Sequence, residues 1–352
     1  MARKISLMRY KEDLNGVSFS HVMEDGPDDV SPNYRHGAKY GNGGFTGQRC
    51  MLHTAGEFEG RRVMFRLEDH ITRLFETVSA LEWMKFPWDR TTLMDAMFRL
   101  LVANQGDDYF SLVFASGGDV GVKPKVQPQH HCFINSRDFD PVRNPYLGPK
   151  ALAEGMTVRL TEPDIRRRPP GPLSRAKVAG NYIDSNVAKH RAERAGCDDA
   201  LILDYTGNNI AELSVSNVIG LFGDTLISPD ASSGALNGIT KQTIQTIAYE
   251  LHGVPTTEGV ISVGDLPRMK MMIACGTAIG AVRIKQIVRD SGVIVWRQPP
   301  IPEAEQLAIT LTTDIWRVMR GEITDVNERH PEWFTPIPEH FLHEAQQVLR
   351  LH

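Results

Sequence analysis

The sequence lacks the features of membrane, secreted disulfide-rich and nucleic-acid-binding proteins. No window of its 352 residues approaches the roughly 18 consecutive apolar residues that a membrane-spanning helix needs. The N-terminal residues contain no apolar stretch of the kind that signal peptides have. The formal net charge is −4, so no basic excess favours nucleic acid or an anionic membrane. We therefore expect a soluble, cytoplasmic protein without membrane or nucleic-acid partners.

Signatures of metal and dinucleotide binding are also missing. The four cysteines are far apart and form no Cys-x-x-Cys pair, which argues against a zinc module or a disulfide framework. His130 and His131 precede a cysteine, but neighbouring side chains of a strand point to opposite faces. No Gly-x-Gly-x-x-Gly follows a strand, so a dinucleotide fold has no support. The basic run Arg166–Arg168 precedes two prolines and is typical of a solvated loop.

What is present is the composition of a globular protein with room for two domains. Apolar residues make up 41% of the chain and charged residues 23%. Residues 137–149 contain three prolines among polar residues, as linkers between domains often do. We expect a small N-terminal domain over residues 1–136, an interdomain loop over 137–149 and a large domain over 150–352.

Hydrophobic periodicity predicts both helices and strands. Leu67, Ile71, Leu74, Val78 and Leu81 recur at steps of four and three, which places them on one face of a helix. Further helices are expected over 91–104, 181–195 and 240–251, and strands over 156–160, 200–204, 210–222, 254–260 and 270–274. Helices mixed with antiparallel strands favour an α+β or barrel-like second domain over a doubly wound sheet.

Two segments are suited to holding a phosphate group. Residues 237–240 (Asn-Gly-Ile-Thr) precede an expected helix, whose N-terminus offers unpaired N–H groups and the positive end of a dipole. Residues 275–278 (Cys-Gly-Thr-Ala) follow an expected strand and place a glycine beside a hydroxyl. Each segment alone is weak evidence, because Gly-Ile-Thr before a helix is also an ordinary N-cap.

One acidic residue and one lysine add to this pattern. Glu212 lies in an otherwise apolar strand sequence, although strands disfavour glutamate. A buried carboxylate needs a partner, and a protonated pyridine nitrogen is a suitable one. Lys177 stands in the sequence AKVAGNY, where a lysine considered alone is typical of a solvated surface.

Taken together and in order, these segments resemble one known family. KVAGNY, AELSVSN, GALNGIT and CGTA resemble the fold-type IV enzymes that use pyridoxal 5'-phosphate (PLP), and most of all the branched-chain amino acid aminotransferases. YGNGGFTGQR, FRLEDHITRL and PYLGPKALAEGM are similar to signatures of the same family, so the resemblance covers residues 36–330. It implies a small N-terminal α/β domain, a larger barrel-like α/β domain with the active site between them, and a homodimer.

The resemblance also implies a role for each matching residue. Lys177 would hold PLP as a Schiff base and move the proton of the substrate α-carbon, and Glu212 would pair with the pyridinium nitrogen. The remaining cofactor-binding residues would be Tyr182 near the ring oxygen and, around the phosphate, Arg73, Ile239, Thr240 and Thr277. The substrate would be bound by Tyr40, Phe45, Arg49, Tyr146 and the backbone N–H of Ala278.

The sequence departs from the family pattern in three places. Ile279 and Gly280 stand where the family has a glutamate after Gly-Thr-Ala-Ala. Of the other two departures, only the loss of an arginine bears on the substrate. Thr46 stands where the family usually has glutamate, and Ser111 stands where branched-chain enzymes place an arginine that reads a carboxylate. Serine cannot pair with a carboxylate as a guanidinium does. An aminotransferase for hydrophobic amino acids and 2-oxo acids is therefore expected, with a D-amino acid or (R)-amine transaminase and a lyase of the aminodeoxychorismate type as alternatives. A non-catalytic descendant is disfavoured, because the lysine, the glutamate and the phosphate-binding residues are all present.

Overall fold

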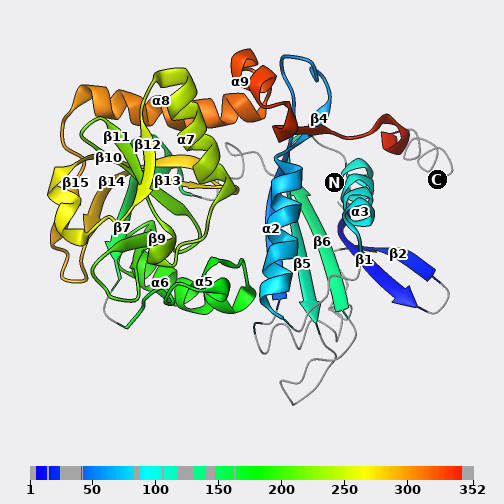
Figure 1. The fold of residues 1–352 in the computed structure, drawn as a ribbon, viewed down its shortest axis with the longest axis horizontal. Coiled ribbons are helices and arrows are strands. Elements are labelled where there is room, and N and C mark those ends of the chain that lie inside the picture. The colour runs from blue at the N-terminus through cyan, green and yellow to red at the C-terminus, as the bar shows by residue number, and fades with distance from the viewer. Residues whose placement is uncertain are drawn as a thin grey trace. The chain divides into compact units, whose positions relative to one another are not determined.

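The chain forms two compact units in the computed structural model (Figure 1). The structure describes residues 5–13, 16–23, 41, 43–82, 88–104, 107–117, 130–138, 147–161 and 164–342. Unit 1 comprises Met1–Arg143, Ala176–Gly180 and Arg320–His352, and unit 2 comprises Asn144–Arg175 and Asn181–Met319. The first boundary between the units, after Arg143, falls within the interdomain loop that was expected over residues 137–149. The division differs from the expected one because two later segments, 176–180 and 320–352, belong to unit 1 and not to the large domain.

Unit 1 is built on a seven-stranded antiparallel sheet. Its strand order is β16-β4-β3-β5-β6-β1-β2. The strands are β1 (Ile5–Asp13), β2 (Gly16–Met23), β3 (Gly43–Leu52), β4 (Arg62–Phe65), β5 (Tyr109–Gly117), β6 (His130–Asp138) and β16 (Phe334–Pro336). The helices are α2 (Leu67–Ala80), α3 (Arg90–Ala103) and α9 (Thr324–Arg329). Helix α2 packs on β3, and α3 packs on β1 and β6.

Helix α2 confirms the hydrophobic stripe found in the sequence. Leu67, Ile71 and Leu74 are fully buried, and each buried aliphatic side chain contributes about 1.5–3 kcal/mol. Glu68 and Asp69 lie in the first turn, where negative charge favours the positive end of the helix dipole. The stripe therefore determines which face of α2 packs on the sheet. Because the helix cannot rotate, it also determines where the polar residues beside the stripe are placed.

The C-terminal segment is part of unit 1 because it extends the sheet. Strand β16 pairs with β4, and the Phe334 ring packs against His53 and Phe65 at ring-centre distances of 5.5 and 5.7 Å. The backbone N–H of Arg66, at the start of α2, donates to the carbonyl of Trp333 at 2.6 Å. These contacts join residues far apart in sequence, so no local pattern could have assigned the segment to this unit.

Unit 2 contains a mixed nine-stranded sheet. Its main path is β12-β11-β10-β13-β14-β7-β8-β9, and β15 pairs with β14 beside that path. The strands are β7 (Met156–Leu160), β8 (Asp199–Leu203), β9 (Ile210–Leu213), β10 (Asn217–Phe222), β11 (Thr225–Pro229), β12 (Thr256–Gly259), β13 (Met269–Gly276), β14 (Gly280–Val288) and β15 (Ile294–Arg297). Strand β9 also packs against β10 and β11, so the sheet curls towards closure. The barrel-like α+β expectation is confirmed.

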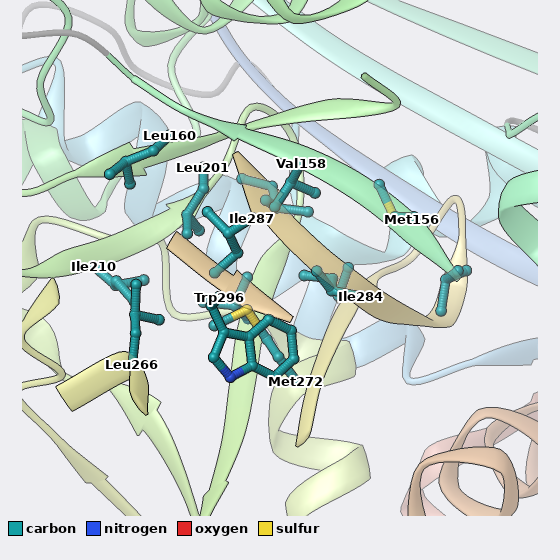
Figure 2. Packing of buried hydrophobic residues seen from close by; sticks show 14 of the residues in the cluster. Met156, Val158, Leu160, Leu201, Ile210, Leu266, Met272, Ile284, Ile287 and Trp296 are labelled. Atoms are coloured by element: carbon teal, nitrogen blue, oxygen red, sulfur yellow. The ribbon is translucent and has the colours of Figure 1, made fainter. Parts of the chain in front are cut away.

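Helices cover part of this sheet and enclose its core. They are α4 (Pro149–Glu154), α5 (Pro172–Arg175), α6 (Tyr182–Arg194), α7 (Ile239–His252) and α8 (Pro302–Met319), of which α7 and α8 pack on β13 and on each other. Figure 2 shows the buried cluster around Val158, Leu201 and Trp296. The Trp296 indole donates to the carbonyl of Met269 at 3.1 Å, so its one polar group is satisfied inside the core.

Most elements of unit 2 agree with the expectations from sequence. Strand β7 and helices α6 and α7 lie within one residue of the predicted bounds. The strand expected over 210–222 is two strands, because the N–H of Leu213 donates to the carbonyl of Ser216 and turns the chain between them. Among the described residues, no helix is both long and apolar enough to cross a membrane.

Candidate functional site

The main chain of Lys177 is held in unit 1 by one hydrogen bond to the backbone of β3 and one to a side chain of α2. The N–H of Phe45 donates to the Lys177 carbonyl at 3.0 Å, and the Lys177 N–H donates to the Thr77 hydroxyl at 3.1 Å. Next to it, Val178 forms a bridge with Gly44 of β3. The Lys177 amine lies 4.8 Å from the centre of the Phe45 ring. The lysine predicted to carry the cofactor is thus fixed at its main chain by two rigid elements.

Two glycines allow this close approach. The N–H of Gly180 donates to the carbonyl of Gly41 at 2.9 Å. A Cβ on Gly41 would lie 2.7 Å from the Gly180 Cα, and Gly41 has a φ of 63°, which favours glycine. The segment 176–180 therefore needs a glycine at this crossing.

Arg73 lies on α2 beside a threonine and a histidine. Its Nη2 donates to the Thr46 hydroxyl at 3.3 Å and to His70 Nδ1 at 3.4 Å, and Thr46 Oγ1 is 3.1 Å from His70 Nδ1. Burial holds the pKa of His70 well below its usual 6.5, and the charges of Arg73, Arg66 and Lys177 lower it further. The lowered pKa favours the neutral imidazole at physiological pH, and the contact with Arg73, which can only donate, favours Nδ1 as the acceptor.

The predicted substrate residues of unit 1 lie partly on β3. Phe45 and Arg49 are four residues apart on this strand, which places them on one face. The Arg49 guanidinium carbon lies 5.7 Å from the centre of the Phe110 ring. Burial lowers the pKa of Arg49 to about 9, with Asp108 opposing this shift and Arg320 adding to it. Tyr40 and Tyr146 lie outside the described residues.

Ser111, the residue that replaces the family arginine, belongs to the core of unit 1. It pairs with Gln48 of β3 and Ser136 of β6, and its side chain is buried. Its neighbours two residues away on β5, Tyr109 and Val113, pack in the cluster under α2 and α3. Alternation along the strand therefore places Ser111 on the same core-facing side.

In unit 2, Glu212 is buried and accepts from an arginine, a side-chain amide and a backbone N–H. Arg167 Nη2 lies 2.8 Å from Glu212 Oε1, while Oε2 accepts from the Asn217 amide and from the Leu236 N–H, both at 3.3 Å. A buried carboxylate keeps its charge only when it is paired and hydrogen-bonded in this way. These three partners therefore stabilise a negative charge on the Glu212 carboxylate.

The N-terminus of α7 has the geometry of an anion site. The helix begins after Gly238 without a side-chain cap, and Ile239 and Thr240 are buried in its first turn. A Cβ on Gly238 would lie 1.8 Å from the Asn217 Oδ1, so the backbone packs where a side chain could not fit. First-turn N–H groups and the helix dipole both favour a phosphate there.

The other predicted residues of unit 2 lie in turns or at a helix start. Thr277 and Ala278 form the turn between β13 and β14 and are half-buried. Tyr182 is the first residue of α6 and is also half-buried. Their roles remain predictions from the resemblance.

Three residues at these sites were not identified from the sequence. Helical spacing puts His70, like Arg73, off the expected stripe of this helix and free to face solvent or a ligand, but no role for His70 followed from the sequence. Thr77 lies one turn further on and showed no signal. The interpretation of Arg166–Arg168 as a solvated loop is wrong for Arg167, whose side chain is 12% exposed and paired with Glu212. A run of arginines in the sequence does not reveal that one of them pairs with a carboxylate far away along the chain.

The residues present fit PLP. In unit 1, Arg73 is a donor suited to a phosphate. In unit 2, the first-turn N–H groups of α7 are also suited to a phosphate, and Glu212 is an anion suited to a protonated ring nitrogen. Lys177 supplies the primary amine that an aldehyde requires. In the part of the chain that the structure describes, no group of three or more His, Cys, Asp or Glu residues is placed to hold a metal ion.

Comparison with known proteins gives the family. The family model of amino-transferase class IV matches residues 54–287. The chain is 28% identical over 256 residues to the putative branched-chain-amino-acid aminotransferase of Methanocaldococcus jannaschii, covering 72% of this chain and 81% of that protein. It is 28% identical over 302 residues to the branched-chain-amino-acid aminotransferase of Pseudomonas aeruginosa, covering 85% and 90%. The chain belongs to the class IV aminotransferases.

Solved structures agree on the fold. The Escherichia coli branched-chain amino acid aminotransferase superposes with a TM-score of 0.76 at 22% identity, covering 91% of this chain and 97% of that one. The PLP form of the branched-chain amino acid aminotransferase from Thermobaculum terrenum gives a TM-score of 0.73 at 22% identity, covering 96% and 100%. The fold-type IV architecture expected from the sequence is confirmed.

Proposed function

We propose that this transaminase uses PLP, held by Lys177 as a Schiff base, to move an amino group between a hydrophobic, branched-chain-like amino acid and a 2-oxo acid. The observation that supports this most is the scaffold formed by β3 and α2. It fixes both the main chain of Lys177 and the guanidinium of Arg73 within unit 1. A primary amine and a phosphate-binding cation on one rigid support suit an aldehyde that carries a phosphate.

We assign the other contacts to the cofactor by residue. Arg73, Thr277 and the first turn of α7, which contains Ile239 and Thr240, hold the phosphate, and Tyr182 lies near the ring oxygen. When bound, PLP supplies a ring that withdraws electrons from the substrate α-carbon. Glu212 keeps the ring nitrogen protonated, and its own negative charge is sustained by Arg167 at 2.8 Å.

The chemical steps of the protein itself fall to Lys177. Its amine, released from the cofactor when the amino group of the substrate takes its place, would accept the proton of the substrate α-carbon and hold it for return, which is general acid–base catalysis. The contacts of its main chain with Phe45 and Thr77 fix the point from which the lysine side chain extends. The backbone N–H of Ala278 donates to the substrate carboxylate, and Phe45 with Arg49 borders the substrate side chain.

The substrate class rests on the relatives, which are named as branched-chain aminotransferases. The sequence departs from that family at the serine of β5, so the amino acceptor needs a direct test. The resemblance further supports a homodimer, which light scattering of the purified chain would measure.

A panel of half-reactions tests the proposal. The purified holoenzyme is mixed separately with L-leucine, D-alanine and an aromatic (R)-amine, and conversion of the cofactor to pyridoxamine phosphate is followed by absorbance. Conversion by L-leucine supports the proposed function. Conversion only by D-alanine or the amine replaces it with the corresponding alternative. Release of pyruvate from aminodeoxychorismate without any conversion replaces it with a lyase.

A further inference from the structure

The Arg73 guanidinium is held on one side by two neutral groups. Its Nη2 donates to Thr46 Oγ1 at 3.3 Å and to His70 Nδ1 at 3.4 Å. Both acceptors are buried on the inner side of unit 1, with exposed fractions of 0% and 1%. Thr46 comes from β3 and His70 from α2, so the two acceptors belong to the two elements that also hold Lys177.

We propose that Thr46 and His70 are positioning residues that orient Arg73 toward the cofactor phosphate without neutralising its charge. This inference rests on the proposed function, because it assigns the phosphate of PLP to Arg73. Neither residue need touch the cofactor. Their effect on it passes through the guanidinium.

The three contacts favour one arrangement of the protons. Arg73 can only donate, so both Thr46 Oγ1 and His70 Nδ1 accept from it. Thr46 Oγ1 also lies 3.1 Å from His70 Nδ1, so the Thr46 hydroxyl and Arg73 Nη2 share the single lone pair of that nitrogen. This requires a neutral imidazole with its proton on Nε2. The depressed pKa of His70, caused first by burial and then by Arg73, agrees with that form.

Neutral acceptors and a carboxylate would act differently at this place. A carboxylate beside Arg73 would hold the guanidinium more strongly but would also compensate its charge. A hydroxyl and a neutral imidazole fix the orientation of one Nη group while the positive charge remains available to a dianionic phosphate. Because one side of the planar guanidinium is already held, Arg73 loses little conformational freedom when the phosphate binds.

The test compares PLP with pyridoxal, which lacks the phosphate. Full-length protein is stripped of cofactor, and its affinity for each compound is measured from the absorbance of the lysine adduct. The variants are Thr46→Val and His70→Leu, which remove an acceptor, with Thr46→Ser and His70→Asn as matched controls that retain one. Because a hydrogen bond to a charged group is stronger than one between neutral groups, we expect Thr46→Val and His70→Leu each to weaken PLP binding about tenfold or more.

Pyridoxal separates positioning from a merely structural role. We expect its affinity to be unchanged in all four variants, and Thr46→Ser and His70→Asn to bind PLP within about threefold of the original chain, since they preserve an acceptor. In the background of Arg73→Gln, Thr46→Val should have no further effect on PLP, because the two changes act through one group.

Two results would overturn the inference: equal weakening of PLP and pyridoxal, or unchanged PLP affinity in both Thr46→Val and His70→Leu. Equal weakening would show a general disturbance of the unit, and unchanged affinity would show that Arg73 needs neither acceptor. If Lys177 forms no adduct with either compound in the original chain, the proposed function fails instead. The two failures are therefore distinguishable.

Discussion

The two units supply different kinds of chemical group. Unit 1 offers side chains on a sheet and helix scaffold: the Lys177 amine and the Arg73 guanidinium, with the neutral acceptors Thr46 and His70. Unit 2 offers a buried acid, Glu212, and the backbone donors at the start of α7. Substitutions in unit 1 should therefore act through the deleted side chain. In unit 2, activity should depend more on the charge of Glu212 and on the backbone packing at the start of α7 than on which side chains the first turn of α7 carries.

The largest effect should come from the lysine of unit 1. Replacing Lys177 with alanine removes the group that binds PLP covalently and transfers the proton, so we expect a loss of about 10⁴-fold in the half-reaction rate. Stopped-flow absorbance with L-leucine measures it. The control Lys150→Ala removes an exposed lysine of α4 and should leave the rate unchanged. A Lys177→Ala protein with near-normal rate would remove the catalytic assignment.

The acid of unit 2 should have the next largest effect. Glu212→Gln keeps the size of the side chain but removes the charge beside Arg167. Loss of one fixed electrostatic contact to a reacting group costs about 10²–10³-fold in rate, and we expect kcat to fall by this amount with PLP still bound. The matched control is Glu305→Gln, which breaks an exposed pair with Arg283 in the same unit. Equal rates for the two variants would contradict an electronic role for Glu212.

A backbone change in unit 2 should act through packing. In Gly238→Ala the new Cβ meets the Asn217 Oδ1, and overpacking of this kind costs about 1–3 kcal/mol of unfolding free energy. Urea unfolding of the cofactor-free protein measures it, and PLP affinity should fall as well. The control Gly171→Ala adds a Cβ that meets no atom within 4 Å. If both variants unfold at the same urea concentration, the close packing at the start of α7 is refuted.

The smallest effect concerns the histidine of unit 1. The folded-state pKa of His70 lies below the unfolded value near 6.5, so the unfolded chain binds more protons as pH falls. The unfolding free energy should therefore decrease below pH 6.5, by up to about 1.4 kcal/mol per pH unit from this group. His53, whose pKa burial lowers to about 4, adds a similar slope between pH 6.5 and 4.

Urea unfolding of the cofactor-free protein at several pH values checks this expectation. His70→Asn retains an acceptor but cannot take up the proton, so its slope below pH 6.5 should be shallower than that of the original chain. His53→Gln should flatten the slope to a similar degree and serves as the reference within the same unit. An identical slope with and without His70 would contradict its neutral form in the folded state.

The sequence predicted local structure better than long-range assembly. The stripe on α2 and the bounds of β7 and α7 follow from periodicity and from glycine at helix ends, which are local signals. Segments 176–180 and 320–342 join unit 1 through pairing with β3 and β4, and no local pattern reveals such partners.

The same distinction applies to the site residues. Glu212 could be identified because an acid in an apolar strand is unusual. Arg167 could not, because its importance depends on a carboxylate 45 positions away. The contacts of Thr46 and His70 with Arg73 could not be predicted for a similar reason. Their role follows from one guanidinium that reaches both, across a strand and a helix.

The central claim is that one particular amine carries the cofactor. Reducing the purified holoenzyme with borohydride fixes the adduct, and peptide mass spectrometry then locates the phosphopyridoxyl group. The account expects this group on the peptide that contains Lys177 and on no other. A label on a different lysine, or no label in a protein that still converts L-leucine, would contradict it.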